Sequence, residues 1–95
     1  MTKAVYMLVG SKHRGADIEN LVKSLPRGEP VSLRREHGNR YDPLAVQVWA
    51  RGIHVGYIPA RVNATLARRL DGMGEGAEIP GVYNPSSARW IEIDE

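Results

Sequence analysis

The segment 44–58 carries the pattern that most restricts how this chain can fold. Apolar side chains occupy every second position from 44 to 48 and again from 53 to 57, and Arg51-Gly52 lies between the two runs. A repeat of two places alternate side chains on opposite faces of a strand, and a short connection ending in glycine permits a tight turn. The segment therefore predicts a β-hairpin over residues 44–58, with Ala45, Gln47 and Trp49 on the side away from the core.

Four further segments have strand-like patterns, and they lie at 3–10, 31–34, 77–83 and 89–93. A short amphipathic helix, with Asp17 as its N-cap, is predicted to stop before Pro26. A chain of 95 residues can enclose one hydrophobic core and little else, so residues 1–95 are expected to form a single domain. Short antiparallel strands in a small sheet gain by hiding their edges. The predicted fold class is therefore mainly β with two short helices (α+β), arranged as a small closed or nearly closed antiparallel β-barrel.

The second helix is predicted to open at Pro59 and to end at Gly72. Its buried stripe recurs at four-residue steps and consists of Val62, Leu66 and Leu70. On a continuous helix Arg61 and Arg68, which are seven residues apart, would lie on the same exposed face. The helix would then present two cations to solvent on one side.

Positive charge is concentrated in the first part of the chain. The formal net charge is +2, yet residues 1–70 contain 12 of the 13 Lys and Arg and only 5 of the 11 Asp and Glu. A basic face is therefore expected. The absence of cysteine excludes a disulfide framework and a thiolate metal site, and it favours an intracellular, cytoplasmic location. The longest apolar run, 4–9, is far shorter than the roughly 20 residues of a membrane helix, so no membrane partner is expected.

The loop 10–15 follows a strand and precedes a helix, as a phosphate-binding loop does. The Lys-Ser/Thr pair of nucleotide-hydrolysing loops does not follow Gly15, however. What the loop offers is three adjacent side chains, Lys12, His13 and Arg14, that can meet a phosphate or stack on a base; a solvated basic loop is the simpler alternative. The three histidines are too scattered for a metal site, and no nucleophile or paired-carboxylate arrangement is present. Neither catalysis, nor a cofactor, nor a metal is expected.

The turn before the predicted hairpin contains an aromatic residue that turn formation does not explain. Three of its residues are ordinary turn formers, namely Asn39, Asp42 and Pro43. Tyr41 is not, and together with Tyr57 it would offer aromatic surfaces for stacking, beside a carboxylate at Asp42 that can accept a hydrogen bond from a hydroxyl. Gly56 has no side chain, so a ligand or another backbone could approach closely there.

These segments resemble the HIRAN domain family. The likeness rests on the basic loop after Gly10, on 31–36 (VSLRRE), on 39–46 (NRYDPLAV) and on 55–59 (VGYIP), and it extends from about residue 4 to residue 83. The resemblance implies an OB-like antiparallel β-barrel that holds the 3′-hydroxyl end of single-stranded DNA. It also implies that Asp42 accepts a hydrogen bond from the terminal hydroxyl and that Tyr41 lines or stacks on the terminal nucleotide.

The family occurs at the N-terminus of helicase-like ATPases that remodel replication forks, and as small stand-alone proteins. The resemblance therefore implies a role in DNA repair, with a helicase, a nuclease or another DNA-processing protein as partner. Its DNA-binding members have an arginine and an aromatic residue where this chain has Lys12 and His13, and a histidine where it has Tyr57. Their later basic residue falls near Ala60, which makes Arg61 the nearest substitute.

The leading hypothesis is a non-catalytic module that recognises the 3′ end of single-stranded DNA. Its expected DNA-binding residues are Lys12, His13, Arg14, Tyr41, Asp42, Tyr57, Arg61 and Arg68. One alternative is a protein-interaction β-barrel whose basic face docks an acidic partner, with Trp49 as the anchor. A weaker alternative is a nuclease accessory with Asp42 as a lone metal ligand, although one carboxylate rarely forms a magnesium site.

Overall fold

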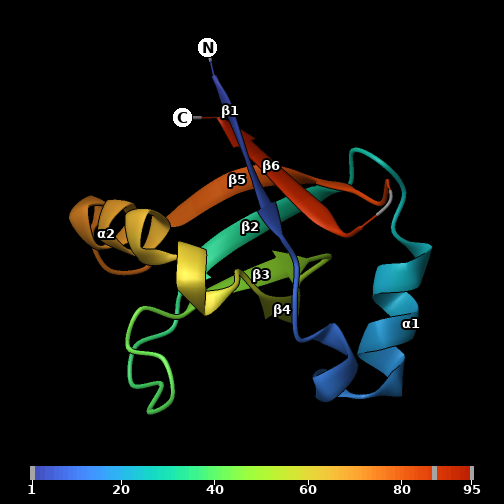
Figure 1. The fold of residues 1–95 in the computed structure, drawn as a ribbon, viewed down its shortest axis with the longest axis horizontal. Coiled ribbons are helices and arrows are strands. Elements are labelled where there is room, and N and C mark those ends of the chain that lie inside the picture. Colours follow the sequence, from blue (N-terminus) through green and yellow to red (C-terminus); the bar gives the residue numbers. More distant parts are fainter. Residues whose placement is uncertain (1, 87, 95) are drawn as a thin grey trace.

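The computed structural model describes residues 2–86 and 88–94 of the chain. One sheet contains six strands in the order β1-β6-β5-β2-β3-β4, and all neighbouring strands are antiparallel. The strands are β1 (Lys3–Met7), β2 (Pro30–Arg35), β3 (Val46–Ala50), β4 (Ile53–Tyr57), β5 (Glu78–Asn84) and β6 (Trp90–Asp94). The helices are η1 (Ser11–Arg14), α1 (Ala16–Ser24), η2 (Ala60–Val62) and α2 (Ala64–Met73), where η marks a 3-10 helix. The two α-helices lie at opposite ends of the sheet (Figure 1). The prediction of a mainly β fold with two helices is confirmed.

The two edge strands of the sheet meet at one point. Val9, just after β1, forms an isolated antiparallel bridge with Tyr57 at the end of β4, and both backbone hydrogen bonds of this bridge measure 2.9 Å. The ladder does not continue between β1 and β4, so the sheet is not closed into a barrel along its length. The expected OB-like barrel is therefore not confirmed.

The hairpin predicted from the alternating pattern is present as β3 and β4. Its two connecting residues, Arg51 and Gly52, have φ values of 53° and 75°. Positive φ at both central residues matches the turn whose twist suits a two-residue hairpin connection. The register shifts between Val48 and Trp49, which pair with Gly56 and His54, so the extra residue of this irregularity is Val55 in β4. Ala45, which was predicted on the outer side of the hairpin, is instead buried.

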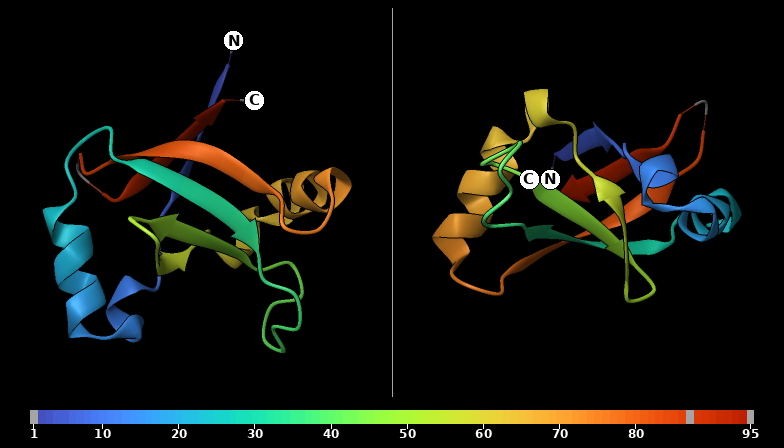
Figure 2. Two further views of the ribbon diagram at one scale, coloured as in Figure 1. Left: turned by 180° about the vertical axis from the view of Figure 1, so that it is seen from behind. Right: turned by 90° about the horizontal axis from the view of Figure 1, so that it is seen from below.

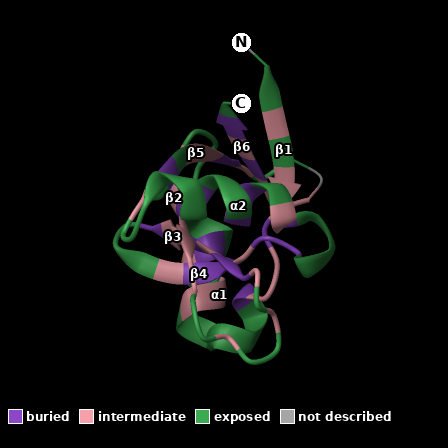
Figure 3. Cartoon of the chain, turned by 90° about the vertical axis from the view of Figure 1, so that its left-hand side faces the viewer, coloured by how far each residue is buried: buried purple, intermediate pink, exposed green. Residues whose placement is uncertain are grey.

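The hydrophobic core lies on one face of the sheet and beneath the helices. Its largest fully buried side chains include Leu33, Val46, Val48, Val55, Leu66, Leu70, Ile79, Ile91 and Ile93. In Figure 3 the buried class follows the strands and the inner sides of the helices, while the outer turns of α1 and α2 are exposed. Both helices are thus amphipathic, as their spacing predicts.

The helix predicted from Pro59 to Gly72 is instead two helices. η2 ends at Val62, the chain turns at Asn63, and α2 begins at Ala64. Val62 is 42% exposed and does not belong to the buried stripe, which was wrongly predicted to include it. The break separates Arg61 in η2 from Arg68 in α2, so these two cations do not share one helix face.

Several predicted boundaries also differ from those observed. α2 continues past Gly72 and ends before Gly74, whose φ of 102° favours glycine. Asp17 lies in the first turn of α1, and the N-cap is Gly15. β1 stops at Met7, and the basic segment that we expected to be a loop is η1. The turn expected at 84–87 includes Ser87, which lies outside the described residues.

Candidate nucleic-acid interface

All of the predicted site residues except Arg68, which lies on α2, come from four segments that the fold gathers around the end of β4. Seen from below, η1 and the loop 36–45 lie to either side of β4 and η2 (Figure 2). The bridge between Val9 and Tyr57 fixes η1 against this end of β4, because Gly10 and η1 follow it directly. Segments that are distant in the sequence therefore form one region of the molecule.

Glu36 is the centre of the hydrogen bonds in this region. Its Oε1 accepts hydrogen bonds from the amide of Gln47 and the hydroxyl of Tyr57, both at 2.7 Å. Its Oε2 accepts one from Nδ2 of Asn39 at 2.8 Å. Burial alone would raise the pKa of the Glu36 carboxyl, but these hydrogen bonds outweigh it and hold that pKa below its ordinary value. Glu36 is therefore ionised at neutral pH.

Tyr57 is held in place by the same carboxylate. Burial, followed by the hydrogen bond to Glu36, raises the pKa of the Tyr57 phenol. The hydroxyl therefore stays protonated and donates a hydrogen bond to Glu36. Only the ring of Tyr57, which is half-buried, remains to contact a ligand.

Asn39 links Glu36 to the turn that contains the predicted Tyr-Asp pair. Its Oδ1 accepts hydrogen bonds from the backbone N–H groups of Tyr41 and Asp42, both at 2.9 Å. These bonds fix the backbone of the turn, as the Asx-turn geometry of asparagine predicts. The side chain of Tyr41 projects from this fixed backbone and is 90% exposed.

Asp42 also has a structural role in the turn. Its Oδ1 accepts a hydrogen bond from the backbone N–H of Leu44 at 3.0 Å, and its Oδ2 accepts one from Nδ2 of Asn63 at 2.8 Å. An ionised carboxylate has about four lone-pair sites, so two remain after these contacts. Asp42 is half-buried, and the predicted contact with a terminal hydroxyl stays a prediction.

Asn63 joins this turn to the break between η2 and α2. It is 1% exposed, and no hydrogen-bond partner for its Oδ1 is present among the described residues. Leaving a buried acceptor unsatisfied costs about 1 to 3 kcal/mol. We call the five hydrogen-bonded residues Glu36, Asn39, Asp42, Tyr57 and Asn63 the Glu36 cluster.

Gly56 allows the close approach of a second backbone beside the cluster. A Cβ at this position would lie 2.6 Å from the carbonyl oxygen of Val9 and 2.7 Å from Cδ1 of Leu8. Real Cβ atoms do not approach so closely, so glycine is required there. Of the two readings of this glycine, the structure supports the approach of another backbone.

The remaining predicted binding residues differ in how they relate to the cluster. Lys12, His13 and Arg14 are exposed on η1, and Nε of Arg14 donates a hydrogen bond to the backbone carbonyl of His54 at 2.9 Å. Arg61 is exposed two residues before Asn63. Arg68 is exposed on α2, and no hydrogen bond or ion pair joins it to the cluster among residues 2–86 and 88–94.

A row of stacked side chains crosses the outer face of β2, β3 and β4. The guanidinium of Arg34 lies 4.3 Å from the ring centre of Trp49, and the ring of Trp49 is stacked on that of His54 at 5.7 Å. The ring of His54 then meets Tyr57 edge-on at 4.9 Å. Burial, followed by the charge of Arg14, lowers the pKa of His54, so its imidazole is neutral at neutral pH. Trp49 is thus half-buried between two side chains.

Sequence reasoning missed Glu36, Asn63 and Arg34. Glu36 stands within the segment 31–36 on which the family resemblance rests, but its role depends on Gln47 and Tyr57, which are 11 and 21 residues away. Asn63 lies within what the apolar spacing presents as a continuous helix. Asparagine is preferred at helix N-caps and Asn63 is the N-cap of α2, so a local signal for the break was available, whereas nothing local indicates its contact with Asp42.

No group of three or more His, Cys, Asp or Glu side chains that could hold a metal ion is present in residues 2–86 and 88–94. In the same residues, no helix is long and apolar enough to cross a membrane.

Comparison with known proteins agrees with the resemblance seen in the sequence. A family model described as the HIRAN domain matches residues 3–91. The fold is similar to the crystal structure of a protein from Lactobacillus plantarum, with a TM-score of 0.70 and 26% sequence identity, over 98% of this chain and 100% of that one. No curated protein matches the chain. The chain therefore belongs to the HIRAN domain family, which is a family of nucleic-acid-binding modules.

Proposed function

We propose that this HIRAN domain recognises the 3′-hydroxyl end of single-stranded DNA and does so without catalysis. The observation that carries the proposal is the fixed position of the Asp42 carboxylate beside the exposed ring of Tyr41. The carboxylate is oriented by two donors and retains lone pairs for a third. An acceptor-only group of this kind favours a hydroxyl and repels a phosphate at the same place.

Asn63 supports the proposal because its Nδ2 donates a hydrogen bond to Oδ2 of Asp42 and so helps to orient the carboxylate. Its own Oδ1 is buried and lacks a partner among the described residues.

The remaining predicted residues would contribute less specific affinity. Tyr41 is free to stack on the terminal base, and base–aromatic stacking is worth about 1 to 3 kcal/mol. Lys12, Arg14 and Arg61 are exposed and can neutralise phosphates. If about three phosphates are neutralised, the logarithm of the binding constant should fall with the logarithm of salt concentration with a slope near −2.

Fluorescence anisotropy with labelled oligonucleotides of one sequence tests the proposal. The three ligands end in a 3′-hydroxyl, a 3′-phosphate, or a 3′-hydroxyl within a blunt duplex. We expect the single strand with the 3′-hydroxyl to bind most tightly, and Asp42→Ala to abolish that preference. Asp17→Ala, which removes an exposed carboxylate of α1, is the matched control and should leave the preference unchanged.

The thermal unfolding midpoint of each variant separates a lost contact from a lost fold, because Asp42 also stabilises its own turn. Asp42→Asn provides a second variant that keeps an acceptor for Leu44 and removes the charge. Equal affinity of the wild-type protein for 3′-hydroxyl and 3′-phosphate ends would refute end recognition.

A further inference from the structure

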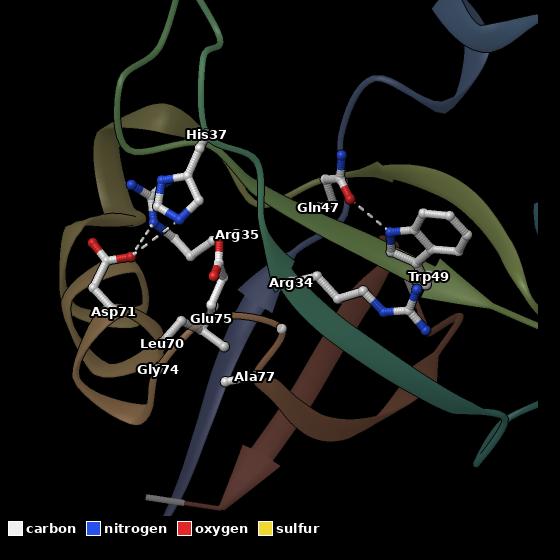
Figure 4. Close-up of a pocket in the computed structure, with 11 residues that line it drawn as sticks. Arg34, Arg35, His37, Gln47, Trp49, Leu70, Asp71, Gly74, Glu75 and Ala77 are labelled. Atoms are coloured by element: carbon white, nitrogen blue, oxygen red, sulfur yellow. Dashed lines mark hydrogen bonds and ion pairs between the residues drawn. The ribbon is translucent and has the colours of Figure 1, made fainter.

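A pocket of about 530 Å³ opens on the outer face of β2 and β3, away from Asp42 and Tyr41. Figure 4 shows it between the end of α2 with the following turn on one side and the strands on the other. Arg34, Gln47 and Trp49 line it from the strands, and Leu70 and Asp71 line it from α2. Its volume lies in the range of pockets that hold small ligands, about 300 to 1,000 Å³.

The flat group in this pocket is the guanidinium of Arg34. One face of it covers the ring of Trp49 at 4.3 Å, and His54 supports that ring from β4. The side chain of Arg34 is 37% exposed and lines the pocket. Guanidinium planes stack on nucleobases as well as on aromatic rings. A base entering the pocket would therefore extend an existing stack of three side chains.

The charges around the pocket favour a neutral group over a phosphate. Nη2 of Arg34 lies 3.1 Å from Oε1 of Glu78, and Nε of Arg35 lies 2.9 Å from Oδ1 of Asp71. The two guanidinium charges are thus paired, and Glu75 adds a further acid to the lining. An anion would gain little net attraction here. An uncharged planar ring is not repelled by these acids, and it gains the stacking on Arg34.

Hydrogen-bonding groups are also present at the edge of the pocket. Nε2 of Gln47 donates to Glu36, and Oε1 of Gln47 accepts from Nε1 of Trp49. A side-chain amide has a second N–H and a second lone pair, so Gln47 can still contact the polar edge of a base. The apolar side chain of Leu70 contributes to the lining opposite.

The pocket and the Glu36 cluster are directly connected. Gln47 and Tyr57 donate to the same oxygen of Glu36. Arg34 pairs with Gln47 between β2 and β3, and Gln47 pairs with Tyr57 between β3 and β4. Two interstrand spacings, about 10 Å, therefore separate Arg34 from Tyr57, the residue of the Glu36 cluster that lies on the sheet. Stacked nucleotides of one strand rise about 3.4 Å each, so this separation corresponds to about three nucleotides.

We propose that this pocket binds a nucleobase of the same single strand, about two to four nucleotides upstream of its 3′ end. The proposal rests on the proposed function, because it takes the position of the strand end from the Glu36 cluster. The base stacks on the guanidinium of Arg34, and the amide of Gln47 contacts its edge. The domain then binds the 3′ end and one upstream base of the same strand.

An abasic scan by anisotropy tests this inference. Single abasic sites are placed at each position of a 3′-hydroxyl oligonucleotide of about eight nucleotides, within the usual length of single-strand binding sites. We expect a loss of affinity of about tenfold at the terminal position and again at one position about two to four nucleotides upstream, with smaller losses elsewhere. A scan in which only the terminal position matters would overturn the inference.

Arg34→Lys assigns the upstream effect to the pocket, because lysine keeps the charge and loses the plane. We expect the upstream loss to disappear in this variant and the terminal loss to remain. Arg27→Lys, an exposed arginine that donates to Ser86, is the matched control and should scan like the wild type. Thermal unfolding confirms that both variants fold. An upstream effect that persists in Arg34→Lys would overturn the assignment, and the pocket would then be open to another occupant such as a protein side chain.

Repeating the scan on a 3′-phosphate oligonucleotide separates the two proposals. An upstream effect that depends on Arg34 without any preference for the 3′-hydroxyl would refute end recognition and support the pocket. A 3′-hydroxyl preference without an upstream effect would refute the pocket alone.

Discussion

The Glu36 cluster and η1 are neighbours in the fold, but their side chains are held in very different ways. In the cluster, Asn39 and Tyr57 each donate a hydrogen bond to Glu36, and the side chains are buried or half-buried. On η1, Lys12 and His13 are exposed, and no side-chain hydrogen bond or ion pair fixes them among the described residues. Pre-organised groups give geometric selectivity at low entropic cost, whereas mobile cations give attraction that salt screens. Under the proposed function, the cluster would therefore supply selectivity and η1 would supply general affinity.

The largest effect is expected where the two regions are joined, at Gly56. In Gly56→Ala the new Cβ would lie 2.6 Å from the carbonyl oxygen of Val9, so the bridge beside Tyr57 must open or shift. Overpacking of this kind destabilises by about 3 kcal/mol, measured as the free energy of unfolding in denaturant. The matched control is Gly72→Ala, because that helical glycine has no neighbouring atom within 4 Å of an added Cβ. It should raise the stability by about 0.5 to 1 kcal/mol. Similar stability of both variants would contradict the close contact at Val9.

Glu36→Ala should have the next largest effect, because it removes the acceptor of three side-chain donors, namely Asn39, Gln47 and Tyr57. We expect a loss of about 2 kcal/mol in the free energy of unfolding at neutral pH. Glu75→Ala, which removes an exposed carboxylate, should cost less than about 0.5 kcal/mol.

The effect of Glu36→Ala should also depend on pH. The pKa of Glu36 in the folded state lies below its ordinary value of 4.5. Its contribution to stability is therefore complete above that value and is lost as the pH falls through the folded-state pKa. The difference between wild type and variant in chemical unfolding should narrow in acid. If wild type and variant differed in free energy of unfolding by the same amount at neutral and at strongly acidic pH, Glu36 would not stabilise the fold as an ionised carboxylate.

Asn63→Ala should have a smaller effect, because it removes a donor and an unsatisfied acceptor at the same time. The lost hydrogen bond to Asp42 costs more than an ordinary one because Asp42 is charged, but removal of the orphaned Oδ1 offsets part of that cost. We expect a net loss of about 1 kcal/mol by chemical unfolding. In anisotropy, the preference for a 3′-hydroxyl end should weaken. Retention of the full preference would mean that Asn63 does not orient Asp42 for binding.

Lys12→Ala should have the smallest effect on folding, because this side chain is exposed on η1. Its free energy of unfolding should change by less than about 0.5 kcal/mol. If Lys12 neutralises one phosphate, the slope of log binding constant against log salt should become shallower by about 0.7. The preference for the 3′-hydroxyl should be unchanged, and its loss would contradict the division of roles between η1 and the cluster.

Local patterns in the sequence predict the elements of this fold well. The hairpin of β3 and β4 follows from the alternating apolar residues and the turn at Arg51-Gly52, because those interactions lie within a few residues of one another. The hydrogen bond from Asn63, at the break between η2 and α2, to Asp42 does not follow, because it spans 21 residues. The bridge of Val9 to Tyr57 is similarly non-local. Apolar spacing contains no information about such contacts.

The same distinction applies to the candidate site. The sequence singles out Tyr41 and Asp42 because turn chemistry accounts for Asp42 and leaves Tyr41 unexplained, and their role in binding stays a prediction. Glu36 and Asn63 are polar residues whose importance lies in distant partners. Trp49 was correctly expected away from the core, but the stack that Arg34 forms on it required the pairing of β2 with β3.

The most direct test of the central claim is a titration followed by NMR, in which backbone and side-chain amide signals report binding residue by residue. Addition of a single strand with a 3′-hydroxyl end should shift the backbone amides of 39–44 and the side-chain amide of Asn63. The same strand with a 3′-phosphate should shift the amides of η1 and leave those signals nearly unchanged. Shifts confined to η1 with both strands, with none in 39–44 or at Asn63, would contradict the assignment of end recognition to the Glu36 cluster.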